Sequence, residues 1–227
     1  MTILTFTLIV FVGAMLAGLV GSLTGLGGGV IIIPMLTLLF HIDIRYAIGT
    51  SLISVIATSS GAASAYVKEG ISNIRLGMFL EIATTCGAVV GALLAAYTPT
   101  PLIEILFAIL LIISAAMSLK EKPESWVKKE SKWARMLKLS STYPTGAGEQ
   151  PYTVQKVPAG FGMMTLAGMI SGLLGIGSGA LKVIAMDTIM KIPFKVSTAT
   201  SNFMIGVTAA ASAGIYLLRG YIDPGVS

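Results

Sequence analysis

The chain has 227 residues, of which 55% are hydrophobic and only 11% charged, with a formal net charge of +5 and a mean hydropathy of +0.88. Soluble globular domains average roughly 25% charged residues, so this composition excludes an ordinary hydrated surface and makes lipid the solvent for much of the chain. The chain has one cysteine, Cys86, and one histidine, His41. Metal sites and nucleophilic catalysis usually need clusters of such side chains, so we expect no metal, no cofactor and no enzyme activity.

Long apolar stretches predict an all-α, polytopic transmembrane helix bundle, since a spanning helix needs about 20 apolar residues. Two segments are short, with 11 residues each, which is enough for only about 16 Å of helix. Each short segment follows a glycine-rich break and therefore either spans with help from its flanks or re-enters the bilayer as a half-helix. In chain order the segments are 3–22, 30–40, 46–67, 76–97, 101–119, 157–174, 180–190 and 197–218.

One long polar segment, 120–156, separates the first five apolar segments from the last three. It contains eight of the 15 Lys and Arg residues: Lys120, Lys122, Lys128, Lys129, Lys132, Arg135, Lys138 and Lys156. Because cytoplasmic loops of membrane proteins are enriched in Lys and Arg, this loop is expected to be cytoplasmic, in a protein of the cytoplasmic membrane. The uncharged turn 98–100 is then expected outside.

Within this loop, Trp126, Trp133 and Leu137 recur at helical spacing among lysines. That pattern predicts a short helix on the inner membrane surface, with Trp at the headgroups and Lys facing anionic lipid. Nucleic acid is not expected as a partner. The stretch 140–155 is rich in Thr, Gly, Pro and Tyr and predicts a flexible linker.

The sequence repeats itself with an offset of 150 residues. Matching pairs run without a gap across more than 50 residues: Ala17-Gly18 with Ala167-Gly168, Gly25-Leu26-Gly27-Gly28-Gly29 with Gly175-Ile176-Gly177-Ser178-Gly179, Thr50-Ser51 with Thr200-Ser201, Thr58 with Thr208, Tyr66 with Tyr216, and Gly70 with Gly220. Duplicated units are a common way to build transporters. We therefore expect two homologous repeats.

The repeat divides the chain into a first transmembrane repeat (1–119), the basic loop (120–156) and a second, incomplete repeat (157–227). The first copy continues past Gly70 through two more segments, whereas the second stops soon after Gly220. The chain is therefore expected to be either a truncated or a natural short form.

Loop charges favour an inverted arrangement of the two copies. If the short segments span, the first copy makes five crossings and the copies are inverted, whereas re-entrant segments would make them parallel. Lys68 and Arg75 place their loop inside, and hence the loop 41–45 outside. Lys191 and Lys195 place the equivalent second loop inside. Inversion is the arrangement we expect.

The paired glycine runs, together with Pro34 and the Gly49-Thr50-Ser51 element, resemble the sulfite exporter TauE/SafE family over nearly the whole chain. The resemblance implies a secondary carrier of sulfite, sulfonates or other small organosulfur anions, built from two homologous halves. The chain departs from a symmetric pattern in having Ser178 opposite Gly28 and Ile184 opposite Pro34.

The glycine runs are candidates for the substrate site. Glycine within a membrane segment allows close helix packing, which is the expected role of Gly87 and Gly91, but it also permits a helix break. Backbone N–H groups at the helix N-terminus that follows such a break attract anions. We expect Gly25, Gly27, Gly28 and Gly29, with Gly175, Gly177, Ser178 and Gly179, to face one central site.

Lys182 is the most informative single residue, because it follows Gly179 by three positions within an apolar stretch. A lysine within the bilayer costs at least ~2.5 kcal/mol without a partner or ligand. An ion pair with Asp187 is disfavoured, since residues five apart lie on different faces of a helix. Lys182 is therefore expected either to line an anion path or to snorkel toward the membrane surface.

Hydroxyl and amide groups in Thr50-Ser51 and Thr200-Ser201-Asn202 are expected to open the next helix of each copy. They can cap it or donate to oxyanion oxygens. Glu81, one to two turns into its segment, is compatible with a proton acceptor or an interfacial carboxylate, and the sequence does not place it in the site.

These features predict a secondary transporter of small anions that alternates access between two repeats, with the lipid bilayer and a small anion as partners. The export direction comes from the family resemblance alone, so an importer of the same anions and a non-transporting scaffold stay open, as does a homodimer. The chain has no Gly-x4-Gly-Lys-Ser/Thr phosphate-binding sequence and is not expected to hydrolyse ATP.

Overall fold

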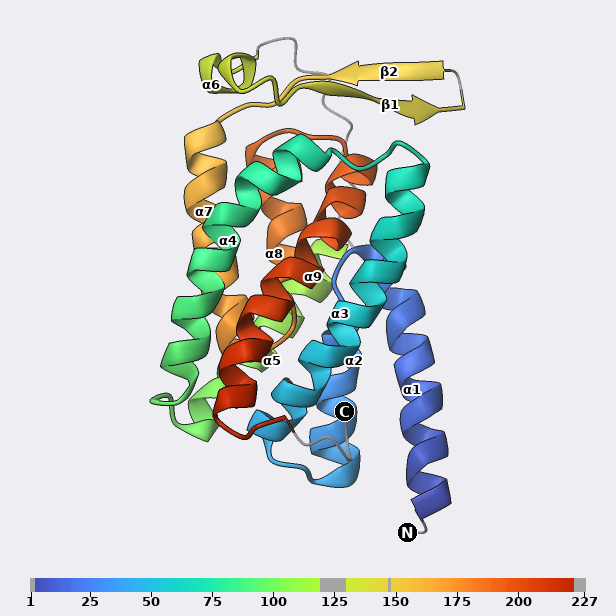
Figure 1. Ribbon diagram of the computed structural model, residues 1–227, viewed down its shortest axis with the longest axis vertical. Helices are drawn as coiled ribbons and strands as arrows, with labels where there is room; N and C mark the ends of the chain where they lie inside the picture. Colours follow the sequence, from blue (N-terminus) through green and yellow to red (C-terminus); the bar gives the residue numbers. More distant parts are fainter. Residues whose placement is uncertain (1–2, 119–129, 147, 223–227) are drawn as a thin grey trace.

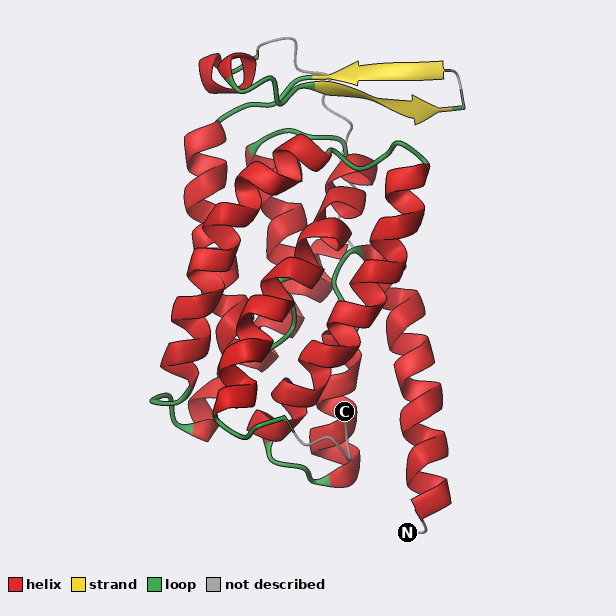
Figure 2. Ribbon diagram, in the orientation of Figure 1, coloured by secondary structure: helices red, strands yellow, loops and turns green. Residues whose placement is uncertain are grey.

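The computed structural model describes residues 3–118, 130–146 and 148–222, which form a helical bundle with a two-stranded sheet at one end (Figure 1). Helices make up the body of the molecule (Figure 2), which confirms the expected helical bundle. The elements are α1 (Ile3–Thr24), α2 (Gly29–Pro34), η1 (Met35–Leu39, a π-helical turn), α3 (Ile44–Lys68), α4 (Ile74–Ala95), α5 (Thr100–Ser118), α6 (Lys132–Met136), β1 (Ser141–Thr145), β2 (Gly148–Tyr152), α7 (Val157–Leu174), α8 (Gly179–Ile184), η2 (Ala185–Ile189, also π-helical) and α9 (Phe194–Leu218).

Among the described residues, five helices are long and apolar enough to cross a membrane, namely 4–24, 44–68, 74–95, 157–174 and 194–218. The segments 29–39 and 100–116 are apolar but shorter. Burial differs strongly between these helices. Only 11% of the most apolar window of α1 is buried, against 44% for α7 and 50% for α4 and α9.

Each short segment folds back along the helix that precedes it. The ring centroids of Phe6, near the start of α1, and Phe40, just after η1, are 4.7 Å apart. In the second half, Gln155 N, just before α7, donates to Met190 O, just after η2, at 3.0 Å. The two helical hairpins, α1–α2–η1 and α7–α8–η2, therefore each return to the end of the bundle from which they start.

The element bounds of the two halves differ by the same 150 residues: α2 and α8, η1 and η2, and α3 and α9 correspond to one another. Left-handed backbone recurs with this offset at Gly25 and Gly175, Gly27 and Gly177, His41 and Lys191, and Gly70 and Gly220. Helices α3 and α9 lie side by side and run in opposite directions (Figure 1). The inverted arrangement of two homologous copies stays a prediction.

Glycines allow α4 and α7 to pack backbone to backbone. A Cβ on Gly87 would collide with Thr165 O, and one on Gly168 would collide with Thr84 O. Gly91 and Gly172 make equally close approaches to the backbone of the other helix. The packing role expected for Gly87 and Gly91 is therefore confirmed.

The stretch 140–155, expected to be a flexible linker, instead contains an antiparallel β hairpin. Strands β1 and β2 pair in register from Ser141 with Tyr152 to Thr145 with Gly148. Their aromatic side chains explain the difference: Tyr143 and Tyr152 are buried against each other, with ring centroids 6.0 Å apart. The linker prediction was wrong because the turn-forming residues connect two strands whose tyrosines pack together.

The expected surface helix is short. Helix α6 has 5 residues, with Trp133 half-exposed and Ala134 buried, while Trp126 lies outside the described residues. The hairpin is joined to the bundle through Asn73, whose Nδ2 donates to Leu139 O at 2.8 Å and to Tyr152 Oη at 2.7 Å.

Candidate functional site

The two glycine runs meet inside the bundle. A Cβ on Gly179 would collide with Gly25 O, and one on Gly29 would lie 3.2 Å from Gly175 O. Gly27, with φ +84°, and Gly177, with φ +74°, adopt backbone that side chains rarely adopt. Both helix breaks are therefore real, and the structure brings them into direct contact.

Two serines hydrogen-bond across this junction in a reciprocal pattern. Ser51 Oγ, on α3, donates to Gly175 O at 2.9 Å. Ser201 Oγ, on α9, donates to Gly25 O at 3.2 Å. Each serine thus satisfies a carbonyl freed by the break in the other half of the chain, and both are fully buried.

The remaining polar residues of the two Thr-Ser elements do not act as helix caps. Helix α3 begins at Ile44, with Asp43 as its N-cap, and α9 begins at Phe194. Thr50 and Thr200 therefore lie within helices, so the expected capping role was wrong. The actual N-terminus of α3 comes earlier because Gly49 continues the helix instead of interrupting it.

Two of these residues have partners on other helices. Thr200 Oγ1 accepts from Asn73 N at 3.0 Å, which ties α9 to the start of α4. Asn202 Nδ2 donates to Ser22 O at 2.8 Å, near the end of α1. Thr50 is buried on α3.

Lys182 has no exposed surface, although it lies in the short and otherwise apolar helix α8. Its Nζ donates to Thr208 Oγ1 at 2.5 Å and lies 3.7 Å from Glu81 Oε2. Thr208 Oγ1 in turn donates to Glu81 Oε1 at 2.6 Å, which also accepts from Thr85 Oγ1 at 2.9 Å. Helices α4, α8 and α9 therefore join in one buried polar network.

Sequence reasoning did not place Glu81 in the site. The side chain that pairs with Lys182 comes from a helix far away in the sequence, and the nearer acid, Asp187, is not that partner. The signal available was the carboxylate itself: Glu81 is the single acidic residue in the apolar segment 76–97. Thr208, matched to Thr58 by the repeat, was noted for its spacing and not for its chemistry.

Buried hydroxyls without a hydrogen-bond partner within the described residues include Ser171 Oγ, near the end of α7, Ser178 Oγ, at the N-cap of α8, and Thr198 Oγ1, at the start of α9. Thr198 lies against Gly25, since a Cβ there would be 2.9 Å from its Cγ2. Ser178 adopts a left-handed φ of 48°, whereas its counterpart Gly28 has a φ of −65°. The two breaks are therefore similar but not identical.

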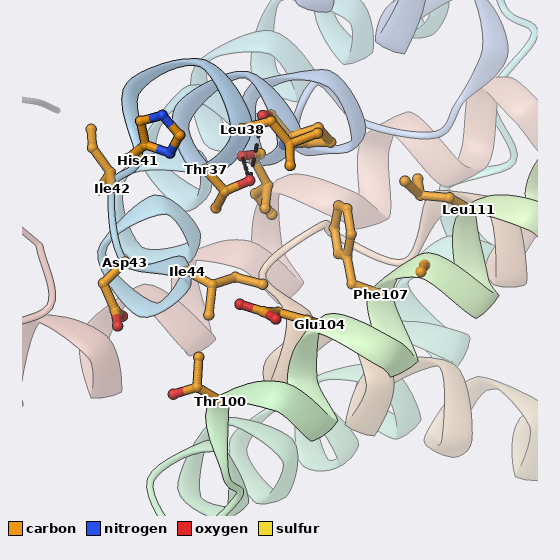
Figure 3. Close-up of a pocket in the computed structure, with 13 residues that line it drawn as sticks. Thr37, Leu38, His41, Ile42, Asp43, Ile44, Thr100, Glu104, Phe107 and Leu111 are labelled. Carbon is orange, nitrogen blue, oxygen red and sulfur yellow. Dashed lines mark hydrogen bonds between the residues drawn. The ribbon is translucent and has the colours of Figure 1, made fainter.

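A cleft of ≈ 530 Å³ lies elsewhere, between α2–η1 and α5 (Figure 3). Its polar lining includes Thr37, His41, Asp43, Thr100 and Glu104, and none of the site residues expected from the sequence lines it. Two carboxylates would repel an anion. The buried network holds one carboxylate, Glu81, beside the ammonium group of Lys182, and this cation makes it the better candidate site for an anion.

Comparisons with known proteins find relatives that are named membrane transporters. The chain is 32% identical to the "Probable membrane transporter protein YunE" of Bacillus subtilis (strain 168), over 97% of this chain and 81% of that protein. It is 29% identical to the "Probable membrane transporter protein YdhB" of the same organism, over 92% and 78%. A third relative, the "Probable membrane transporter protein MJ0441" of Methanocaldococcus jannaschii, is 27% identical over 97% and 76%.

No solved structure matches the chain. The family described as "Sulfite exporter TauE/SafE" matches residues 10–227. This match covers almost the whole chain, and the helices found in the structure fit a multi-pass membrane protein. The chain therefore belongs to the sulfite exporter TauE/SafE family.

Proposed function

We propose that the chain is a secondary transporter that moves a small oxyanion, sulfite or a related organosulfur or sulfonate anion, through the centre of the bundle. The observation that carries the proposal is Lys182, a fully buried cation three residues after the second glycine run. Charged side chains at membrane depth are rare and mark substrate or ion pathways by default. A small anion that leaves water needs such a compensating charge.

The hydroxyls near the glycine junction suit an oxyanion. Ser178 and Thr198, whose hydroxyls have no hydrogen-bond partner within the described residues, offer donors of the kind that replace water around sulfite oxygens. The glycine loops, Gly25 to Gly29 and Gly175 to Gly179, keep the backbone free of side chains there. We assign to the site the residues expected from the sequence, with Thr50, Ser51, Thr200, Ser201 and Asn202 as a polar frame around the loops.

Alternating access between two halves is the mechanism that fits best. The halves are proposed to be inverted copies of one unit, as supported by the constant offset of 150 residues between their elements and by the opposed directions of α3 and α9. The bonds from Ser51 to Gly175 and from Ser201 to Gly25 join the halves at their centre. Rocking of one half against the other would break or strain both bonds, because each bond joins the two halves.

The cytoplasmic membrane is the proposed location, with the β hairpin inside. Lys138 follows α6, Lys156 precedes α7 and Lys191 follows η2. The β hairpin and α6 lie at one end of the bundle (Figure 1), and an excess of cations in the loops at one end marks the cytoplasmic side. Export is proposed from the family description. Uptake of the same anions is the alternative direction.

Transport by proteoliposomes tests this function. The full chain should take up radiolabelled sulfite faster than protein-free liposomes. Lys182→Met should lower uptake by at least ~10-fold, which corresponds to about 1.4 kcal/mol of lost interaction. The matched control is Lys195→Met, which removes an exposed lysine from the first turn of α9 and should leave uptake unchanged.

A second variant, in which both partners of the ion pair are neutral, serves as the control for misfolding. Removing one charge of a buried pair leaves the other unpaired and destabilises the fold, so Lys182→Met is accompanied by the double variant Lys182→Met/Glu81→Gln. A double variant that is monodisperse in detergent and does not transport supports the site. Wild-type protein without flux of sulfite or sulfonates would instead favour a non-transporting scaffold.

A further inference from the structure

Glu81 occupies the position beside Lys182 that an incoming anion would need. Its Oε2 lies 3.7 Å from Lys182 Nζ and, within the described residues, is buried without a hydrogen-bond partner. Its Oε1, in contrast, accepts from Thr208 at 2.6 Å and from Thr85 at 2.9 Å. One oxygen is thus fixed by two hydroxyls, and the other has the ammonium group as its charged neighbour.

We infer that Glu81 is the proton-coupling site of the transporter: a proton on Glu81 releases Lys182 to bind the anion. The inference rests on the proposed function, because Lys182 must meet the anion. With both carboxylate and anion beside one lysine, the buried site would carry a net negative charge, which a low-dielectric interior disfavours. One added proton restores neutrality.

The loading step transfers one proton and no electrons. An O–H bond of a hydronium ion on the entry side breaks as an O–H bond to Glu81 Oε2 forms, and the hydronium ion becomes water. The ammonium group of Lys182 then exchanges its 3.7 Å ion pair for the anion. Thr208 and Thr85 hold Oε1 throughout, so the carboxyl group keeps its orientation, and unloading reverses these steps.

Other titratable groups on the neighbouring elements lie at their ends or surfaces. Helices α4 and α8 pack against α7, α9 and η2. Helix α7 contains no titratable residue, and α9 carries exposed Lys195 in its first turn and buried Tyr216 near its last. Asp187 in η2 is half-exposed, and on α4 itself Arg75 donates to Lys138 O, while Cys86 is exposed. Within this set, the pair Lys182 and Glu81 forms the buried ion pair.

Coupling of this kind makes the cycle electroneutral for a monovalent anion, because one proton and one anion cross together. A pH gradient alone then drives the anion away from the acidic side. The direction of transport then depends on the gradients of protons and of the anion. The same transporter would export an anion whose concentration inside is high enough.

The test uses the full chain in proteoliposomes held at zero membrane potential with potassium and valinomycin. The probe is radiolabelled methanesulfonate, a strong-acid anion whose own charge does not titrate. With an acidic exterior, the wild type should accumulate the probe above equilibrium and acidify the lumen, as read by trapped pyranine. A substrate that carries its own proton, such as bisulfite, would also acidify the lumen, so it could not show that the proton crosses on Glu81.

Glu81→Gln keeps the shape of the side chain and mimics its protonated form. The variant should exchange methanesulfonate at equal pH and lose both pH-driven accumulation and luminal acidification. Its half-saturating concentration at neutral pH should fall by at least ~5-fold, the lower end of typical coupling factors, because no carboxylate competes for Lys182. Glu104→Gln, an exposed carboxylate on α5, is the matched control and should behave as the wild type.

Wild-type transport that ignores the pH gradient would overturn the coupling and leave the proposed function standing. Absence of methanesulfonate and sulfite flux in the wild type would overturn both. The pyranine measurement needs the wild type alone, so it decides the coupling even where Glu81→Gln fails to assemble.

Discussion

Single residues at the glycine junction determine whether the two halves can meet. Gly179 lies where any side chain would collide with the carbonyl oxygen of Gly25. The obstacle is backbone, which cannot move aside as a flexible side chain can. The need for glycine here comes from contact between distant parts of the chain and not from local conformation, since Gly179 is the first residue of α8.

Gly179→Ala should therefore destabilise the protein, by at least the ~1–3 kcal/mol typical of overpacking. The measurement is the midpoint of thermal unfolding in detergent. Gly214→Ala is the control, because the Cβ added there meets no atom within 4 Å, and its midpoint should be equal to or slightly above that of the wild type. Equal midpoints for both variants would show that the junction is looser than described.

Some residues of the network were predictable from sequence and others were not. Lys182 could be singled out because a lone cation within an apolar run has a known cost. Thr208 could not, since a threonine in a membrane helix is unremarkable until its neighbours are known. Glu81 and Thr208 are 127 residues apart, and sequence spacing reports neighbours within a helix but not across helices.

At the scale of elements, periodicity and composition located every described membrane helix. They did not reveal that α1 and α7 each form a hairpin with the short segment that follows. That arrangement depends on contacts such as the Phe6–Phe40 ring pair. The β hairpin was missed because residues typical of linkers also form tight turns, and because burial of Tyr143 and Tyr152 depends on the bundle below.

Burial raises the pKa of Tyr152 to about 12, although hydrogen bonds from Asn73 and Ser141 favour its ionised form. In the unfolded chain the phenol ionises near pH 10. The folded state keeps its proton longer, so stability is full below pH 10 and falls as the pH rises toward 12. The expected loss is about 2–3 kcal/mol from a shift of this size.

Unfolding at increasing alkaline pH in detergent measures this effect. Tyr152→Phe removes the titrating group and should flatten the difference between pH 9 and pH 12 relative to the wild type. Tyr97→Phe, at a highly exposed tyrosine, should keep the wild-type slope. Parallel slopes for wild type and Tyr152→Phe would contradict a buried phenol.

At the scale of the whole molecule, the arrangement of the loops predicts which side of the membrane each end of the bundle faces, and this can be measured. The β hairpin lies at one end of the bundle, and the turn between α4 and α5 lies at the other (Figure 1). Arg75 belongs to the hairpin end, since it donates to Lys138 O, and Arg45, which donates to Thr98 O, belongs to the opposite end. If the hairpin end is cytoplasmic, as proposed, the loops at the opposite end face the outside of the cell.

A membrane-impermeant maleimide tests this assignment in a Cys86→Ser background. Glu149→Cys, at an exposed position on β2, should react in inverted membrane vesicles and not in intact cells. Glu104→Cys, at the opposite end, should react in intact cells. The reverse pattern would place the hairpin outside and contradict the positive-inside argument.

The uneven covering of the two hairpins has a consequence for motion. Helix α7 is held along its length by α4, while α1 has 11% of its apolar window buried. Segments with few buried contacts open locally at lower free energy. Amide hydrogens of α2 and η1 should consequently exchange faster than those of α8 and η2. Lys182 belongs to the more buried hairpin, so in the proposed transport cycle the charge would stay in place while the more loosely held hairpin moved.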